Sequence, residues 1–439
     1  MASWSLHGAV VLVAIAAFAA FDLIAEHPLY GKHVAPLVTP LYDQHIAPLV
    51  DKHVVPLVET WLPRPDNATS YGLAVPLDVP MDLSECRARA GSHLTDVMPI
   101  VGFHVVCLDK QPIKLVGAVF KEGMSTGEPS PFISALDMGS FRREIELKAE
   151  IPGPKDKIAV KYQQPWAYFT PDGSRLTKLS QFNASTPVVY VFEGGQFIWP
   201  GIRIGHKRVV RNLHGLGDVT METLEMTPLV FSVEEFLRDD EIDVVLNLSL
   251  EHLAPSGVTL HDGDEGKPAT EWRTSTTYWL SSSRHPLVQG IDQRVQDLVK
   301  VDKSHQEDVQ VLRYEETQKY DHHTDYFPVE SHQNNPALVE RLHHGFKNRM
   351  ITVFWYMSDV AKGGHTIFPR AGGKQEPASM KDCTVGLKVA PKKRKVIIFY
   401  SMFANGQGDK RSLHGGCPVE DGVKYSGNKW VWNKPRNED

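Results

Sequence analysis

A histidine and an aspartate separated by one residue are the first candidates for chemistry in this chain. They are His323 and Asp325, in the segment Tyr-Asp-His-His-Thr-Asp (320–325). A second histidine, His414, follows much later in Leu-His-Gly-Gly-Cys (413–417). Two imidazoles and one carboxylate can hold a divalent iron ion on one face and leave other coordination positions open. We therefore expect His323, Asp325 and His414 to be metal ligands.

The adjacent His322 competes with His323 for this role. In an extended strand, the side chains at positions i and i+2 point to the same face. His323 therefore shares a face with Asp325, whereas His322 points to the opposite face. This alternation favours His323 as the ligand.

A lysine after the second histidine completes a candidate co-substrate site. Lys424 lies in Gly-Val-Lys-Tyr (422–425). A lysine ammonium can bind the distal carboxylate of a dicarboxylate that chelates the metal through its 2-oxo acid end. The pattern indicates an oxygenase that depends on Fe(II) and 2-oxoglutarate, with His323, Asp325, His414 and Lys424 as its catalytic residues.

Composition and charge limit the class of protein. The 439 residues are 42% hydrophobic and 23% charged, which is typical of a globular protein longer than one ordinary domain. The net charge of −6 provides no basic field, so we expect no nucleic-acid partner.

The four cysteines are too few for a disulfide scaffold, and none forms a Cys-x-x-Cys zinc motif. Their grouping allows the bridges Cys86–Cys107 and Cys383–Cys417, which is one of three connectivities.

The N-terminal region is apolar and then rich in proline and histidine. Gly8–Phe21 is an unbroken run of small and apolar residues, which as a helix would span about 21 Å, short of a bilayer core of roughly 30 Å. We expect residues 1–25 to be a signal peptide or a signal anchor that sends the chain into the secretory pathway. Residues 26–65 contain three copies of a His-Val-Ala-Pro-Leu-Val-like repeat, whose prolines disfavour long helices and central strands. We expect a stem there.

Residues 66–220 are expected to form a smaller β-rich domain of unknown role. Runs of β-branched and aromatic residues predict strands, and three Asn-x-Ser/Thr sequons, at Asn67, Asn183 and Asn247, agree with a lumenal location. The expected strands are 101–108, 114–120, 157–162, 187–192 and 208–213.

Residues 221–436 are expected to form the catalytic domain. Helices are predicted to begin at Ser232 and to cover 286–301, where apolar residues recur with helical spacing. Many short strands follow, so the chain is predicted to be mainly β with flanking helices, and this domain to be a jelly roll. The expected strands are 309–314, 351–357, 387–389, 395–399 and 429–432.

Blocks of sequence between residues 225 and 434 resemble the prolyl 4-hydroxylase family, most closely its single-chain plant and algal members. They occur together and in family order, which makes the resemblance specific. The blocks are Arg-Thr-Ser-Thr (273–276), 310–314, 318–327, 348–352, 356–360, 363–369, 391–393, 413–419 and 422–425.

The resemblance implies a double-stranded β-helix (jelly roll) that uses Fe(II), 2-oxoglutarate and L-ascorbate. It implies that Tyr314 and Thr352 hydrogen-bond the same carboxylate as Lys424. It also implies that Tyr320 and Trp430 line the peptide or co-substrate pocket. Core packing is the alternative for Tyr314, Thr352 and Trp430.

The activity implied is 4-hydroxylation of peptidyl proline in secretory-pathway proteins, of the procollagen-proline dioxygenase type, with release of succinate and CO₂. The expected location is the membrane of the endoplasmic reticulum or Golgi, with the catalytic domain in the lumen. One alternative is hydroxylation of another side chain, such as lysine. A second is an inactive binding or docking protein on the same fold, and a third places the main role in residues 66–220. Two departures from the family, His322 for Pro and Tyr425 for Trp, leave the peptide preference open.

Overall fold

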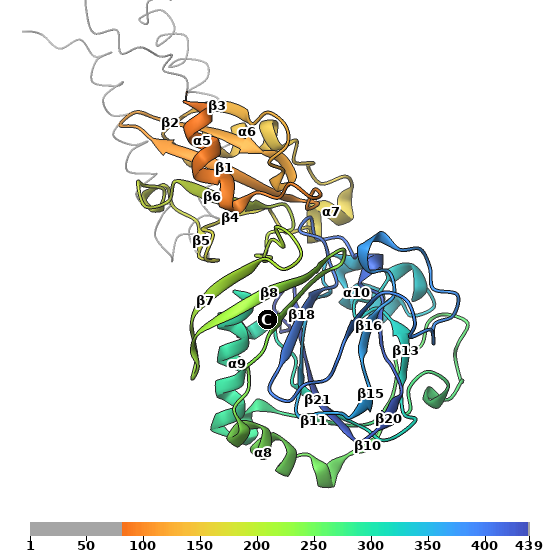
Figure 1. The fold of residues 1–439 in the computed structure, drawn as a ribbon. Coiled ribbons are helices and arrows are strands. Elements are labelled where there is room, and N and C mark those ends of the chain that lie inside the picture. Colours follow the sequence, from red (N-terminus) through yellow and green to blue (C-terminus); the bar gives the residue numbers. More distant parts are fainter. Residues whose placement is uncertain (1–80, 438–439) are drawn as a thin grey trace, which may run out of the picture. The chain divides into compact units, whose positions relative to one another are not determined.

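Figure 1 shows the fold in a computed structural model of the chain, which describes residues 81–437. The expected signal segment (1–25), the stem (26–65) and the sequon at Asn67 lie outside the described residues. Within the described part, no helix is long and apolar enough to cross a membrane. The chain from Pro80 onward forms one compact unit.

The first sheet within residues 81–437 has six antiparallel strands in the order β3-β2-β1-β6-β4-β5. Side chains alternate between its two faces. Phe103 and Val105 pack in one hydrophobic cluster with Cys86, whereas Val106 packs in another cluster with Phe141. The strands are β1 Phe103–Lys110, β2 Lys114–Phe120, β3 Ser130–Ala135, β4 Ala167–Phe169, β5 Arg175–Leu176 and β6 Val188–Phe192.

Both faces of this sheet are covered because each carries a helix. The first cluster includes Cys86 of α5 (Leu83–Ala90), and the second includes Phe141 of α6 (Met138–Ala149). The segment 157–162, predicted as a strand, is instead the helix α7 (Lys157–Tyr162). The reason is local, because the side chain of Asp156 accepts a hydrogen bond from the backbone N–H of Ala159 at 2.8 Å and caps the helix.

A second, nine-stranded antiparallel sheet follows, in the order β10-β11-β12-β21-β14-β18-β9-β8-β7. The domain boundary expected at residue 220 falls inside β8, which pairs with β9, so residues 207–226 belong to this sheet. The strands are β7 Lys207–Leu213, β8 Gly217–Met226, β9 Leu229–Val233, β10 Ala254–Pro255, β11 Thr276–Leu280, β12 Val309–Tyr314, β14 Arg349–Tyr356, β18 Val396–Tyr400 and β21 Lys424–Trp432.

The helix predicted to begin at Ser232 begins later, as α8 (Asp239–Asn247). Ser232 lies inside β9, between partners on β8 and β18. The helix starts where the carboxylate of Glu241 accepts from the backbone N–H of Arg238 at 3.0 Å. The second predicted helix is α9 (Pro286–Val299), which starts with proline and buries Val288, Ile291, Val295 and Leu298.

A four-stranded antiparallel sheet, in the order β13-β19-β16-β17, packs against the nine-stranded one. One hydrophobic cluster joins Tyr314 and Phe399 of the larger sheet to Phe368 and Val389 of the smaller. The site described below lies beside this cluster. The remaining elements are β13 Tyr320–His323, β15 Lys362–Gly363, β16 Thr366–Phe368, β17 Leu387–Val389, β19 His414–Gly416, β20 Val419–Asp421 and α10 Pro336–Arg341.

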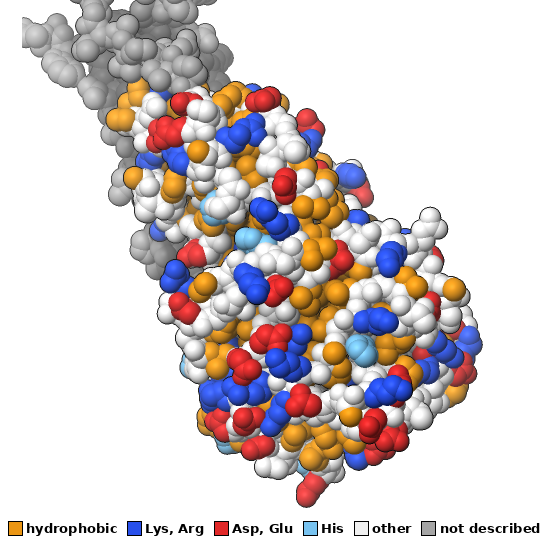
Figure 2. Space-filling model, in the orientation of Figure 1, with side chains coloured by type: hydrophobic (Ala, Val, Ile, Leu, Met, Phe, Trp, Pro, Cys, Tyr) orange, Lys and Arg blue, Asp and Glu red, His pale blue; other side chains and the backbone are white. Residues whose placement is uncertain are grey.

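Two disulfides complete the fold and pair all four cysteines. Cys86–Cys107 joins α5 to β1, and Cys383–Cys417 joins the segment before β17 to the end of β19. Paired cysteines are typical of proteins that fold in an oxidising compartment. On the face shown in Figure 2, basic and acidic side chains are interspersed, in line with the composition.

Candidate metal and co-substrate site

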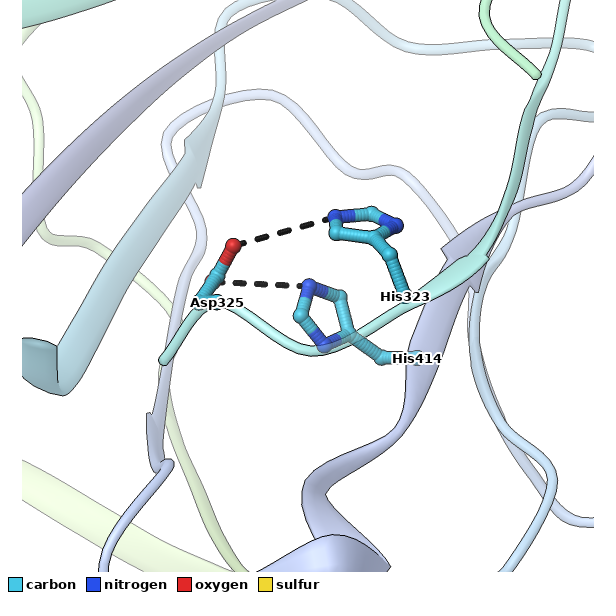
Figure 3. A group of neighbouring side chains, drawn as sticks. All are labelled: His323, Asp325 and His414. Atoms are coloured by element: carbon cyan, nitrogen blue, oxygen red, sulfur yellow. Dashed lines mark ion pairs between the residues drawn. The ribbon is translucent and has the colours of Figure 1, made fainter. Parts of the chain in front are cut away.

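Strand pairing brings the two candidate histidines together. β13 and β19 are antiparallel neighbours, and His323 lies directly opposite His414. Asp325 follows His323 by two residues and turns its carboxylate toward both rings (Figure 3). Its Oδ1 is 3.7 Å from Nε2 of His323, and its Oδ2 is 3.4 Å from Nε2 of His414. One ligand atom from each residue lies within 4.8 Å of the others, which suits a single metal ion.

Backbone carbonyls orient both imidazoles. Nδ1 of His323 lies 2.8 Å from the carbonyl oxygen of Asp321, and Nδ1 of His414 lies 2.9 Å from that of Ser412. A carbonyl can only accept, so each Nδ1 carries the proton and each Nε2 has a lone pair to offer a metal. Burial, followed by the neighbouring His414, lowers the pKa of His323 to about 3, so this ring is neutral as a metal ligand must be.

The buried side chain of Asp325 is kept in its ionised, carboxylate form. Its Oδ2 accepts a hydrogen bond of 2.6 Å from the hydroxyl of Thr352 on β14. Burial acts to raise the pKa of Asp325, but His414, His323, Arg349 and the Thr352 hydroxyl together hold that pKa below its ordinary value. The hydroxyl of Thr352 thus donates to Asp325, and the hydrogen bond from Thr352 to the co-substrate carboxylate, which the family resemblance implies, stays a prediction.

Lys424 is a buried cation without an acidic partner. Its Nζ donates to the carbonyl of Gly364 at 2.7 Å and lies 5.4 Å from the ring centre of Tyr314, its neighbour across β12 and β21. No carboxylate within residues 81–437 pairs with it. Burial lowers the pKa of Lys424 to about 7. An unpaired ammonium in the interior is costly, and an anionic ligand would remove that cost.

The histidines and Lys424 border the same aromatic interior. The ring of His414 lies 4.5 Å from that of Phe399, in the cluster that also contains Tyr314 and Phe354. Lys424 Nζ is 5.4 Å from the ring of Phe354. The donor set of two imidazoles and a carboxylate fits Fe(II), and the nearby unpaired ammonium fits the far end of a dicarboxylate.

A cavity of about 330 Å³ opens beside the metal site, and both Tyr320 and Trp430 line it. The ring of Tyr320 stacks on that of His323, with 3.7 Å between centres. Two further lining residues, Arg273 and Arg349, were not identified from the sequence as site residues. Only the three-dimensional structure reveals them. The guanidinium of Arg349 lies 3.6 Å from the centre of the Trp430 ring, and that of Arg273 lies 4.5 Å from the centre of the Tyr320 ring.

His322 stays outside the group of three ligands. Among the described residues, neither of its ring nitrogens has a hydrogen-bond partner. It lines a larger neighbouring cavity of about 780 Å³ together with Tyr320 and Met380. His323, and not His322, is thus the histidine that groups with Asp325 and His414.

Known proteins share this half of the chain. The profile of the 2OG-Fe(II) oxygenase superfamily matches residues 309–432. Prolyl 4-hydroxylase 2 of Arabidopsis thaliana is 36% identical over 211 residues, which are 46% of this chain and 67% of the relative. Prolyl 4-hydroxylase subunit alpha-1 of Rattus norvegicus is 35% identical over 205 residues, which are 46% of this chain and 34% of that subunit.

Among solved structures, the viral collagen prolyl hydroxylase of Paramecium Bursaria Chlorella virus-1 in its 2OG complex is 24% identical. The match has a TM-score of 0.32 and covers 46% of this chain and 95% of the viral one. The identity and coverage of the plant relative decide the family. This chain belongs to the prolyl 4-hydroxylase family of 2-oxoglutarate- and Fe(II)-dependent oxygenases.

Proposed function

We propose that this protein hydroxylates C4 of peptidyl proline in proteins of the secretory pathway, using O₂ and 2-oxoglutarate and releasing succinate and CO₂. One observation carries the proposal, namely the combination of a two-histidine, one-carboxylate cluster with a buried, unpaired Lys424 beside it. The first provides an iron site, and the second provides the charge that a dicarboxylate co-substrate needs. The likeness to prolyl 4-hydroxylases supplies the target residue.

The residues divide the work as follows. His323, Asp325 and His414 hold Fe(II), and Lys424 with Tyr314 receives the distal carboxylate of 2-oxoglutarate. Thr352 positions Asp325 through its hydrogen bond. When bound, iron and 2-oxoglutarate supply the oxidising chemistry, and L-ascorbate keeps the iron reduced. The two packed sheets, as a double-stranded β-helix, hold these groups fixed and exclude water.

The aromatic cavity beside the metal is the place for the proline ring. Tyr320 and Trp430 offer flat apolar surfaces, and the guanidinium groups of Arg273 and Arg349, which also line the cavity, lie against those rings. Proline is a compact apolar ring without a backbone N–H donor, so packing rather than hydrogen bonding would recognise it.

The location we propose is the membrane of the endoplasmic reticulum or Golgi, with the catalytic half in the lumen. The paired cysteines support an oxidising compartment. The sequon at Asn183 lies at an exposed position, which is where a glycan can be attached. The apolar run in residues 1–25 supplies the signal peptide or anchor.

The test is turnover by the full chain with Fe(II), ascorbate, 2-oxoglutarate and three peptides that are proline-rich, collagen-like or lysine-bearing. Mass spectrometry with fragmentation reads a hydroxyl on the peptide, and a separate assay reads succinate. We expect hydroxylation at proline C4 that is lost in His414→Ala and kept in His252→Ala, an exposed histidine outside the site. Hydroxylation of lysine alone would reassign the target. Absence of both products from folded, iron-loaded protein would overturn the oxygenase proposal.

A further inference from the structure

A separate cavity of about 600 Å³ shares no lining residue with the two cavities at the metal site. It lies among the short helical turn Gly91–His93, strand β6, strand β7 and the end of α9. Its volume is in the range of small-molecule sites.

Arg208 is the unusual residue of this cavity. Its Nη2 donates to the carbonyl of Pro200, and its guanidinium carbon lies 5.0 Å from the ring centre of Trp199. Its Nε is shielded from solvent and has no hydrogen-bond partner among residues 81–437. Within the same residues, no carboxylate forms an ion pair with it, and burial lowers its pKa. A shielded donor on an unpaired cation is a cost that the fold alone does not offset.

The two carboxylates that line the cavity are already engaged elsewhere. Asp297 accepts from the backbone N–H of His214 at 2.9 Å and from the side-chain amide of Gln293 at 3.0 Å. Asp172 accepts from the Thr170 hydroxyl within its own turn. Neither lies within ion-pair distance of Arg208, so the protein leaves this charge available to a ligand.

The other groups around Arg208 suit an anion with an apolar body. Lys300, at the end of α9, adds a second positive charge. His93 and His206 add ring nitrogens that can donate a hydrogen bond. Tyr190 and Trp199 contribute aromatic surface from the same cavity.

We propose that this cavity binds a small organic anion, whose carboxylate or phosphate group pairs with Arg208 and whose ring or chain packs against Trp199 and Tyr190. Such a site gives the chain a second ligand site, built from segments on both sides of residue 220. The proposal does not depend on the iron chemistry, since no metal or co-substrate residue takes part in it.

The probes for the test are benzoate and phenyl phosphate, which carry the two oxyanions on the same ring. Binding to the full chain is measured by titration calorimetry and by the shift in thermal midpoint, for wild type, Arg208→Met and Arg203→Met. Arg203 is an exposed arginine that does not line the cavity and serves as the matched control. We expect wild type and R203M to bind at least one probe equally and R208M to bind it at least tenfold more weakly. The preferred probe identifies the oxyanion.

The thermal midpoint of each variant without ligand shows whether Arg208 serves to bind a ligand or to stabilise the fold. Because R208M removes an unpaired charge, its midpoint should equal or exceed that of wild type. A midpoint several degrees lower, with no probe bound by wild type, would assign Arg208 to packing and overturn the proposal, as would binding unchanged in R208M. If R208M does not fold, Lys300→Met and His206→Gln replace it, and each should weaken binding severalfold. Unchanged affinity in both would equally reject the site.

Discussion

Lys424 is a buried cation whose surroundings favour the binding of an anionic ligand. The side chain is almost completely buried, with one carbonyl and three aromatic rings around its Nζ and no carboxylate partner among the described residues. Aromatic faces attract a cation, but weakly compared with a carboxylate. The charge is therefore most favourable when a dicarboxylate is bound, which links the stability of this strand to co-substrate binding.

Replacing Lys424 with Met should weaken 2-oxoglutarate binding by roughly 10- to 150-fold, the value of a hydrogen bond to a charged group of about 1.5–3 kcal/mol. Titration calorimetry with Mn(II) in place of iron measures this. Lys429→Met is the matched control, because Lys429 lies on the same strand and is equally buried but pairs with Asp292 at 2.5 Å. K429M should unfold more readily and keep its co-substrate affinity. Equal losses of affinity in both variants would argue against a specific role for Lys424.

The pH dependence of co-substrate binding follows from the same residue. Burial lowers the pKa of Lys424 to about 7 in the ligand-free protein, and a bound carboxylate raises it again. Above pH 7, binding must therefore take up a proton, so affinity should fall by up to tenfold per pH unit between pH 7 and 9 and stay level below 7. Calorimetry in buffers of different ionisation enthalpy counts that proton. Affinity independent of pH in this range would show that Lys424 stays charged without ligand.

At the scale of single residues, the sequence predicts which residues form the candidate metal site better than it predicts their hydrogen bonds and ring contacts. His323, Asp325 and His414 could be named as candidates because metal ligation requires those residue types, and strand alternation favoured His323 over His322. The hydrogen bond from Thr352 to Asp325 could not be predicted, because it joins β14 to the turn after β13. The rings of Tyr320 and Trp430 were expected at the pocket, but the presence of Arg273 and Arg349 beside them depends on contacts between segments far apart in the sequence.

Among the elements, β19 carries the second histidine and is tied to a distant segment by a disulfide. Cys417 follows His414 closely and pairs with Cys383. The segment before Cys383 also contacts the first histidine strand, because the carbonyl of Met380 accepts from the backbone N–H of His322 at 2.8 Å. The disulfide therefore links β19 to a segment that is hydrogen-bonded to β13, the strand that carries the other candidate histidine ligand.

Replacing both cysteines of this bridge with serine should cost about 4 kcal/mol of unfolding free energy for a separation of 34 residues. The double substitution should also weaken Mn(II) binding severalfold, because the strand that carries His414 is no longer covalently fixed at Cys417. The matched control is Cys86→Ser with Cys107→Ser, whose separation of 21 residues predicts a loss of about 3 kcal/mol. That bridge joins α5 to β1, so metal affinity should be unchanged. Denaturant unfolding and metal titration of both double variants measure these two effects. Equal metal affinity in the two variants would show that the Cys383–Cys417 bridge does not support the metal site.

Helices and strands were predicted correctly where the spacing of apolar residues was clear. They were predicted wrongly where a capping residue or pairing with distant strands determined the structure. Helix α9 shows apolar residues at helical spacing and was found as expected. The segment 157–162 has the β-branched and aromatic residues of a strand, but Asp156 caps it into a helix. Ser232 has the features of a helix start, yet two neighbouring strands hold it in β9. Tertiary pairing overrides local preference in such cases.

At the scale of the whole molecule, one hydrophobic cluster spans both large sheets. It includes Phe103 and Phe192 of the six-stranded sheet and Val353 and Trp355 of the nine-stranded sheet. Hydrogen bonds also tie the segment between the two sheets to the second one, as between the N–H of Trp199, which lies between β6 and β7, and the hydroxyl of Tyr400 on β18 at 3.0 Å. The sequence suggested two domains meeting near residue 220, because composition and strand spacing do not reveal which sheet a strand will join.

This shared core predicts where the chain can be cut. A chain that begins at Pro80 retains every described element, and we expect it to unfold in a single cooperative transition and to bind Mn(II) as the full chain does. A chain that begins at residue 221 loses β7 and the first four of the ten residues of β8. It also exposes the sides of Met226, Phe231 and Tyr400 that face the missing part. Exposed apolar surface of this kind drives aggregation, so this shorter chain should be insoluble or lack a cooperative transition. Circular dichroism melting and size-exclusion chromatography of the two chains make the comparison. A soluble, cooperatively folded chain from residue 221 that binds metal would show that the catalytic half is an independent domain and that the six-stranded sheet contributes nothing to its stability.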